Sequence, residues 1–166
     1  MAIIITGAAG FIGAHVARQV LARGDHVVGL DNLNDYYDVQ LKRDRLADIA
    51  HPNFVFHHVD FADPQALNDA LRTVDVDTIV HLGAQAGVRY SLINPRAYAQ
   101  SNLVGHLNLL ELARERGVRQ MIYASSSSVY GNAQALPLRV SDRVDHPISL
   151  YAATKKANEL MSESYA

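Results

Sequence analysis

The sequence predicts a doubly wound α/β fold, in which helices cover both faces of a parallel β-sheet. Three observations favour this class. Short apolar runs rich in β-branched residues alternate along the chain with stretches of helical periodicity. The first apolar run leads into a glycine-rich turn, which is typical of strand-to-helix junctions that bind nucleotides. Hydroxyl and acidic residues follow several predicted strands, at the edge of the sheet where ligands bind in this class.

The first predicted strand, residues 2–6, reads AIIIT and is apolar almost throughout, as expected for a strand that is covered on both faces. Four later runs have the same character and bring the sheet to five strands; they cover residues 26–31, 54–60, 77–83 and 120–125. Because helical stretches separate the strands, the crossovers should be right-handed and the sheet parallel.

The first predicted helix, residues 11–23, places Ile12, Val16 and Val20 at helical spacing and stops before Gly24. Further helices are predicted at 40–49, 64–73 and 95–116, the last being the longest. A final helix should begin near Ser149 and run to the end of the chain. Helices therefore alternate with strands from the first residue.

The doubly wound dinucleotide-binding form, the Rossmann fold, has six strands in the order 3-2-1-4-5-6. Only five can be counted here. We therefore expect residues 1–166 to form one dinucleotide-binding domain that lacks the sixth strand and a C-terminal substrate lobe. We also expect the chain to be the N-terminal part of a longer protein.

Composition excludes several classes of function. The hydrophobic fraction of 49% and charged fraction of 19% over 166 residues suit one soluble domain. A formal net charge of -2 indicates no nucleic-acid partner. Without cysteines, and with eight histidines that show no ligand spacing, we expect no metal site. The start lacks a basic segment and no apolar run reaches the ~18 residues of a membrane span, so we expect a cytoplasmic protein without membrane contact.

The glycine-rich turn reads TGAAGFIG and places Gly7, Gly10 and Gly13 at GxxGxxG spacing before a helix. Such a turn brings backbone close to a ligand, and the N–H groups of the helix N-terminus attract a pyrophosphate. Asp31 closes the second strand, 18 residues after Gly13. A carboxylate there binds the adenosine ribose hydroxyls and repels a 2′-phosphate, so we expect NAD rather than NADP.

Asp60 ends the third predicted strand. A carboxylate at this position is suited to a hydrogen bond with adenine. A local turn or capping role fits the same carboxylate about equally well. Both interpretations of Asp60 stay open at this point.

A tyrosine and a lysine stand four residues apart in YAATKKANEL (151–160), so Tyr151 and Lys155 share one face of a helix. The serine run ASSSSVYG (124–131) follows the fifth strand and should line the cleft, which lets Ser126 converge on the pair. An ammonium and a positive nicotinamide ring would stabilise a phenolate, which could then take a proton from a sugar hydroxyl. The alternative is an exposed Tyr–Lys pair without function.

Together, GAAGFIG, Asp31, ASSSSVYG and YxxxK resemble the extended short-chain dehydrogenase/reductase superfamily, in the NAD-dependent epimerase/dehydratase family. Within it, three longer blocks are similar to UDP-glucuronate 4-epimerases; they read DNLNDYYDVQLKRDRL (31–46), HLGAQAGVRYSLINPRAY (81–98) and SNLVGHLNLLE (101–111). The likeness covers nearly the whole chain.

The resemblance implies roles for individual residues. Tyr151 would be the catalytic base and Lys155 its partner, with a hydroxyl from Ser126 or Ser128. Contacts to NAD are implied for Gly7, Gly10, Phe11, Ile12, Gly13, Asp31, Asn32, Asp60, Phe61, Leu82, Ala84, Gln85, Asn102, Tyr151 and Lys155. Substrate contacts are implied for Ser126, Ser127 and Ser128. Arg89 offers a planar fork for a sugar carboxylate, or else pairs with structure near the cleft.

The implied reaction is oxidation of UDP-glucuronate at C4 by tightly held NAD, turnover of the 4-keto sugar, and return of the hydride to the other face. The partner is then a UDP-sugar, and the full-length protein is expected to be a homodimer. Because the substrate lobe is not expected within these residues, we expect this chain alone to be inactive.

Three alternatives remain. The first is a nucleotide-sugar 4,6-dehydratase, but those enzymes carry a sequence like Thr-Asp-Glu where this chain has Ser126, Ser127 and Ser128. The second is a UDP-glucuronate decarboxylase, which usually carries Thr and Glu in that loop. The third alternative, from a different class, is a non-catalytic NAD-binding module that acts through association.

Overall fold

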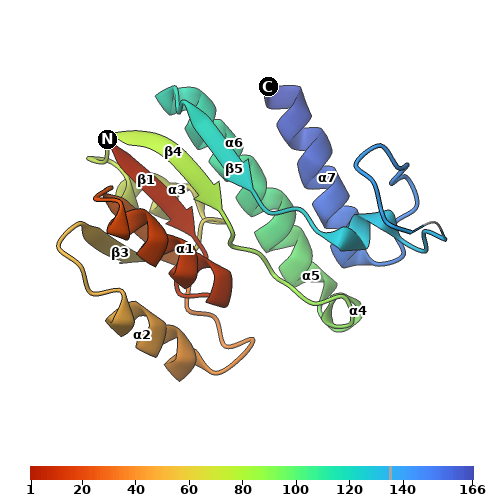
Figure 1. Ribbon diagram of the computed structural model, residues 1–166, viewed down its shortest axis with the longest axis horizontal. Helices are drawn as coiled ribbons and strands as arrows, with labels where there is room; N and C mark the ends of the chain where they lie inside the picture. The colour runs from red at the N-terminus through yellow and green to blue at the C-terminus, as the bar shows by residue number, and fades with distance from the viewer. Residues whose placement is uncertain (135) are drawn as a thin grey trace. The chain divides into compact units, whose positions relative to one another are not determined.

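The computed structural model describes residues 1–134 and 136–166. Five parallel strands form one sheet in the order β3-β2-β1-β4-β5, which confirms the predicted doubly wound class (Figure 1). The strands are β1 (Ala2–Thr6), β2 (Val27–Asp31), β3 (Phe54–His58), β4 (Val76–His81) and β5 (Gln120–Tyr123). In register, Ile3 of β1 lies beside Val27 of β2 and Thr78 of β4.

Helices follow the strands in the expected alternation. They are α1 (Phe11–Ala22), α2 (Val39–Asp48), α3 (Pro64–Ala70), α4 (Tyr90–Ile93), α5 (Pro95–Tyr98), α6 (Gly105–Arg116) and α7 (Leu150–Tyr165), with a π-helical segment η1 (Ala99–Val104) and a 3-10 turn η2 (Ser127–Tyr130). β1 and β2 end where predicted, whereas β3, β4 and β5 end two residues earlier, at His58, His81 and Tyr123, and the residues beyond them belong to the loops at the carboxyl edge.

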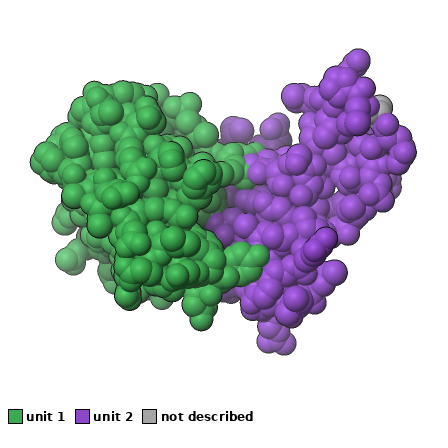
Figure 2. Space-filling model, turned by 60° about the horizontal axis from the view of Figure 1, so that its bottom comes forward, with its two compact units in different colours: residues 1–83, 108–124 green, residues 84–107, 125–166 purple. Residues whose placement is uncertain are grey.

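The chain divides into two compact units, coloured separately in Figure 2. The first comprises residues 1–83 and 108–124 and contains the whole sheet. The second comprises residues 84–107 and 125–166 and contains η1, η2 and α7. The predicted site residues are thus divided between the two units.

Two apolar clusters lie on the two faces of the sheet in the first unit. On one face, Ile4 and Leu30 pack with Leu67 of α3 and Leu109 of α6. On the other face, Ile5 and Val27 pack with three residues of α1, namely Ala14, Ala17 and Leu21. Alternate residues of a strand point to opposite faces, so an uninterrupted apolar strand supplies both clusters.

The predicted helix over 95–116 is not continuous. A π-helical segment, η1, separates α5 from α6. Its buried residue Asn102 accepts a hydrogen bond at its main-chain carbonyl from Asn158 Nδ2 at 2.6 Å, and its side chain bonds the backbone of Gln85. Asn158 and Gln85 are distant from Asn102 in the sequence, so local periodicity could not predict these bonds. π-helical turns are often found at functional sites.

None of the helices in the described ranges is long and apolar enough to span a membrane.

Candidate functional site

The glycine turn after β1 is packed so closely that side chains are excluded. Gly7 has a φ of +68°, and a Cβ there would lie 2.8 Å from the amide nitrogen of Gly83. A Cβ on Gly13 would overlap the carbonyl oxygen of Gly7. The first turn of α1 is thereby held directly against the loop that leaves β1.

The N-terminus of α1 fits an anionic ligand. Gly10 is its N-cap, and within the described residues no side chain caps this end and no acid lies in the first turn. Its first amides are thus available for a phosphate group, with the helix dipole favouring negative charge. Phe11 and Ile12 are 67% and 60% exposed, unusual for large apolar side chains beside a packed sheet. This cradle fits the pyrophosphate of a dinucleotide.

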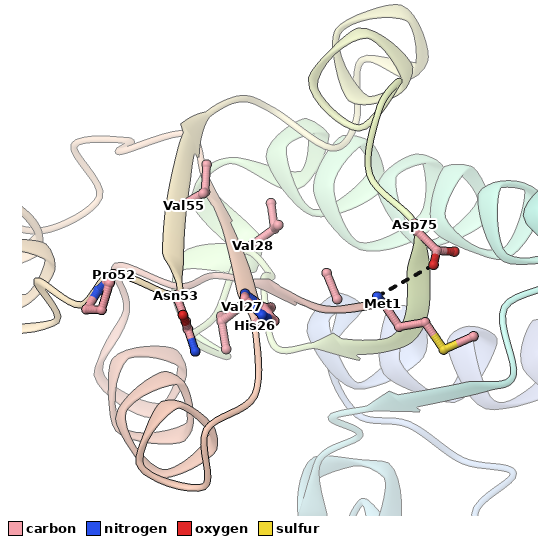
Figure 3. Close-up of a pocket in the computed structure, with 9 residues that line it drawn as sticks. Met1, His26, Val27, Val28, Pro52, Asn53, Val55 and Asp75 are labelled. Carbon is pink, nitrogen blue, oxygen red and sulfur yellow. Dashed lines mark ion pairs between the residues drawn. The ribbon is translucent and has the colours of Figure 1, made fainter.

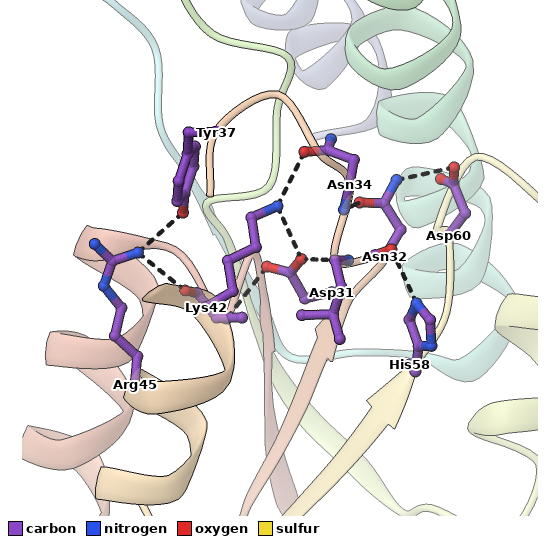
Figure 4. A network of polar contacts seen from close by, with 10 residues as sticks. Asp31, Asn32, Asn34, Tyr37, Lys42, Arg45, His58 and Asp60 are labelled. Carbon is purple, nitrogen blue, oxygen red and sulfur yellow. Dashed lines mark hydrogen bonds and ion pairs between the residues drawn. The ribbon is translucent and has the colours of Figure 1, made fainter. Parts of the chain in front are cut away.

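Asp31 ties the glycine turn to the loop after β2 (Figure 4). Its buried carboxylate accepts hydrogen bonds from the amides of Ala9, at 3.2 Å, and Leu33, at 2.8 Å. Leu33 has a φ of +49°, a left-handed conformation that is unfavourable for a residue with a β-carbon. The hydrogen bond from its amide to Asp31 holds it in this conformation. The carboxylate is thus fixed in place at the carboxyl end of β2, where a ribose would bind.

Asp60 has a structural role that the sequence had left open. One carboxylate oxygen accepts from the amide of Ala62 at 2.9 Å, and the other accepts from Asn32 Nδ2 at 3.1 Å. His58 Nε2 lies 2.9 Å from the carbonyl oxygen of Asn32 (Figure 4). Asp60 therefore builds the turn after β3 and orients Asn32, while its contact with adenine stays a prediction.

Sequence reasoning missed two cations of α2, one beside Asp31 and one that bonds the glycine turn at Ala9. Lys42 of α2 is 4% exposed, and its Nζ lies 3.6 Å from Asp31 Oδ1. Arg45, one turn on, donates from Nη1 to the Tyr37 hydroxyl at 3.0 Å and to the Ala9 carbonyl at 3.4 Å. The signal was present in the block DYYDVQLKRDRL, but a basic residue on a polar helix normally predicts exposure.

Phe61 follows β3, and Leu82 and Gly83 follow β4; these three residues are held in place by ring packing and by backbone amides. The Phe61 ring is buried and packs edge-on to His81, with centroids 5.3 Å apart. The amides of Leu82 and Gly83 bond Thr6, at its carbonyl and its hydroxyl. Any contact of Phe61 with a cofactor would therefore come from its main chain.

In the second unit, Asn102 links the segment after β4 to α7. Its side-chain oxygen accepts from the Gln85 amide at 2.8 Å, and its Nδ2 donates to the Gln85 carbonyl at 3.1 Å and to Thr154 Oγ1 at 3.0 Å. Both N–H groups of the amide are thus used within the protein. Gln85 Nε2 is buried without a hydrogen-bond partner among the described residues, which leaves a donor for a ligand. Ala84 precedes it in the same segment.

Tyr151 and Lys155 lie in α7 as predicted. The Ser149 hydroxyl caps the helix by accepting from the Ala152 amide at 3.1 Å, which places Tyr151 in the first turn. The Tyr151 ring packs edge-on to Tyr98, with centroids 6.1 Å apart. Lys155 is 4% exposed, and burial lowers the pKa of its ammonium to about 8. A desolvated ammonium acts more strongly on a neighbouring phenol than one in water.

The serine run forms η2, which packs against α7. Ser126 is the N-cap of η2, and its hydroxyl accepts from the Ser128 amide at 3.2 Å. Ser126 and Ser128 are half-buried, whereas Ser125 and Ser127 are exposed. Ser125 Oγ donates to the Glu159 carboxylate of α7 at 2.6 Å, which fixes the start of the run.

Arg89 is exposed and stands at the N-cap of α4. Behind it, the buried Tyr98 hydroxyl donates to the carbonyl oxygens of Ala86 and Gly87. The loop that carries Arg89 is therefore anchored at its base, and the exposed Arg89 side chain ends in a planar donor fork of the kind that binds a carboxylate.

Stability should depend on pH through His106 in α6. His106 is fully buried, and burial, with a further contribution from the Lys155 charge, lowers its pKa to about 4. Above pH 6.5 neither the folded nor the unfolded state protonates this histidine. As the pH falls from 6.5 to 4, only the unfolded state takes up the proton, so the free energy of unfolding should fall by about 3 kcal/mol.

Urea unfolding at pH 7.5 and pH 4.5 measures this loss. His106→Gln should flatten the pH dependence by about that amount, whereas His146→Gln, at an exposed position, should leave it unchanged. Equal pH dependence in wild type and His106→Gln would show that His106 does not carry the effect.

The described part of the chain contains no group of three histidine, aspartate or glutamate residues that could hold a metal ion. A pocket of about 260 Å³ lies at the opposite, amino-terminal edge of the sheet, lined by Met1, Ala2, His26, Val27, Val28, Pro52, Asn53, Val55 and Asp75 (Figure 3). Ligands of doubly wound folds bind at the carboxyl edge. We therefore place the candidate nucleotide site at the glycine turn and not in this pocket.

The chain matches known proteins over nearly its whole length. A family model described as GDP-mannose 4,6 dehydratase matches residues 4–166. Protein CapI of Staphylococcus aureus is 50% identical over the whole of this chain, which corresponds to 50% of its own length. A probable UDP-glucuronate 4-epimerase of Rhizobium meliloti is 48% identical over all of this chain and 49% of its own length.

Among solved structures, UDP-glucuronic acid 4-epimerase from Bacillus cereus, in complex with UDP-glucuronic acid and NAD, is similar with a TM-score of 0.89 and 32% identity. The match covers 99% of this chain and 52% of that one. This chain thus spans about half the length of the curated relatives it matches.

Proposed function

Because this chain belongs to the GDP-mannose 4,6-dehydratase family, within the extended short-chain dehydrogenases/reductases, we propose that its full-length protein is an NAD-dependent 4-epimerase of a UDP-sugar. We propose UDP-glucuronate as the substrate and UDP-galacturonate as the product. Relatives named UDP-glucuronate 4-epimerase in Rhizobium meliloti and Arabidopsis thaliana support this choice. The observation that carries the proposal is the buried Lys155 ammonium one helical turn from Tyr151.

In this proposal the glycine turn and the start of α1 hold the pyrophosphate of NAD, and Asp31 accepts hydrogen bonds from the adenosine ribose. Asn32 and Asp60 border the adenine. In the second unit, Gln85 Nε2, which has no hydrogen-bond partner among the described residues, donates to the cofactor, and Asn102 fixes the Gln85 backbone. Support comes from the uncapped N-terminus of α1 and the fixed Asp31 carboxylate.

The chemistry that NAD supplies when bound is reversible acceptance of a hydride from the sugar. Tyr151 Oη takes the proton of the C4 hydroxyl and returns it to the C4 oxygen after the sugar has turned over. The Lys155 ammonium stabilises the phenolate that removes the proton. The Ser126 hydroxyl, with Ser128 as an alternative, hydrogen-bonds the same C4 oxygen and orients it.

The matching family model is named for a dehydratase, but this chain lacks side chains for that reaction at the serine run. Loss of water from C5 and C6 needs an acid and a base beside the sugar. Ser126, Ser127 and Ser128 offer only hydroxyls there. Epimerisation needs no such pair, which favours the epimerase over the dehydratase.

The test is incubation of the full-length protein with UDP-glucuronate, with UDP-glucose and GDP-mannose as parallel substrates, followed by NMR of the sugar protons. We expect UDP-galacturonate to appear until a fixed ratio with UDP-glucuronate is reached. A 4-keto-6-deoxy sugar from UDP-glucose or GDP-mannose would establish a dehydratase instead. A pentose product from UDP-glucuronate would establish a decarboxylase.

A further inference from the structure

Lys42 is a buried cation at the ribose corner of the candidate nucleotide site (Figure 4). Its side chain is 5% exposed, and the Asp31 side chain beside it is 7% exposed. Lys42 Nζ donates to Asn34 Oδ1 at 2.9 Å, lies 3.6 Å from Asp31 Oδ1, and sits over the Tyr37 ring, 5.0 Å from its centroid.

A buried ammonium needs a compensating anion, because desolvation disfavours its charge. Within residues 1–134 and 136–166, the carboxylate that the structure pairs with Lys42 is that of Asp31. The same carboxylate is the proposed ligand of the ribose hydroxyls. Any group that binds at Asp31 therefore comes within a few ångströms of an ammonium.

We propose that Lys42 makes this corner a latent site for a 2′-phosphate. The preference for NAD over NADP then depends on the ion pair between the Asp31 carboxylate and the Lys42 ammonium. This inference rests on the proposed function, since it requires the adenosine ribose to bind at Asp31. It assigns Lys42 as a specificity-determining residue for the cofactor.

The chemistry of a 2′-phosphate fits the neighbours of Lys42. An ammonium is a strong donor to phosphate oxygens. Arg45 adds positive charge one helical turn away, with its guanidinium carbon 5.6 Å from the centroid of the Tyr37 ring. With Asp31 ionised, its negative charge repels the phosphate and holds Lys42. Once that charge is removed, a 2′-phosphate supplies the anion that Lys42 has lost.

The test compares binding of 5′-ADP and 2′,5′-ADP to the nucleotide-free full-length protein by titration calorimetry. Wild type should bind 5′-ADP more tightly. Asp31→Asn keeps an acceptor for the Leu33 amide but loses the charge, and should shift the affinity ratio towards 2′,5′-ADP by at least about tenfold. Adding Lys42→Met should reverse that shift. Adding Arg43→Met to Asp31→Asn removes an exposed cation from the same helix, and it should leave the ratio of the two affinities as it is in Asp31→Asn.

A second arm does not depend on the folding of Asp31→Asn. Lys42→Met alone leaves the Asp31 charge without its cation, so discrimination against 2′,5′-ADP should increase at least about threefold over wild type. Two results would overturn the role of Lys42. One is a Lys42→Met variant with the wild-type ratio of affinities for 5′-ADP and 2′,5′-ADP; the other is a tenfold shift towards 2′,5′-ADP that persists in Asp31→Asn/Lys42→Met. If wild type bound neither nucleotide, the proposed nucleotide site itself would be wrong, and this inference with it.

Discussion

Replacing Tyr151 by Phe in the full-length protein should lower the rate of UDP-glucuronate epimerisation by at least about a hundredfold, while folding and NAD binding persist. The substitution removes only the hydroxyl that exchanges the proton. The ring remains and keeps its edge-on packing against Tyr98. Steady-state kinetics measure the loss, and circular dichroism with NAD titration establishes that the protein is intact.

Tyr165→Phe is the matched control for this experiment. Tyr165 lies at the other end of α7 and is 39% exposed, so losing its hydroxyl should leave the rate within about twofold of wild type. Near-normal turnover in Tyr151→Phe would refute the role of this residue as the base. Equal losses in both variants would point to a disturbed helix rather than to missing proton transfer.

Replacing Gly13 by Ala should destabilise the protein by about 2 kcal/mol or more and abolish nucleotide binding, because the added Cβ would overlap the Gly7 carbonyl. Helix propensity alone predicts the opposite sign, since Ala is favoured over Gly in a helix by about 1 kcal/mol. The sign of the change therefore separates close backbone packing from local propensity.

Urea unfolding and NAD titration of the Gly13→Ala variant provide the measurement. Gly10→Ala is the graded control, because its Cβ would stand 3.0 Å from the same carbonyl oxygen, a tight contact that a small shift relieves. We expect a smaller loss there than in Gly13→Ala. A Gly13→Ala variant as stable as wild type, with unchanged NAD affinity, would contradict the packing described for this turn.

Local pattern was sufficient to predict the sheet. Each apolar run became a strand, and the glycine turn and Asp31, the acid that ends β2, lie at the carboxyl edge of the sheet as predicted. Backbone spacing also predicted that Tyr151 would share a helical face with Lys155. These features depend on neighbours in the chain, which a sequence displays directly.

Features that depend on distant residues could not be predicted in this way. The periodicity of 95–116 is helical throughout, yet η1 interrupts it where Asn102 bonds Gln85 and Asn158. Lys42 lies on a polar helix whose sequence indicates exposure, but pairing with Asp31 buries it. The lowered pKa of Lys155 likewise arises from burial, which no spacing within α7 reveals.

The fate of the C4 hydrogen tests the central claim most directly. In the proposed epimerisation the hydrogen removed from C4 would return to the same carbon, so it would never reach solvent. UDP-glucuronate deuterated at C4, converted by the full-length protein in ordinary water, should give UDP-galacturonate that retains the deuterium at C4. Replacement of that deuterium by solvent hydrogen would contradict the proposed hydride return.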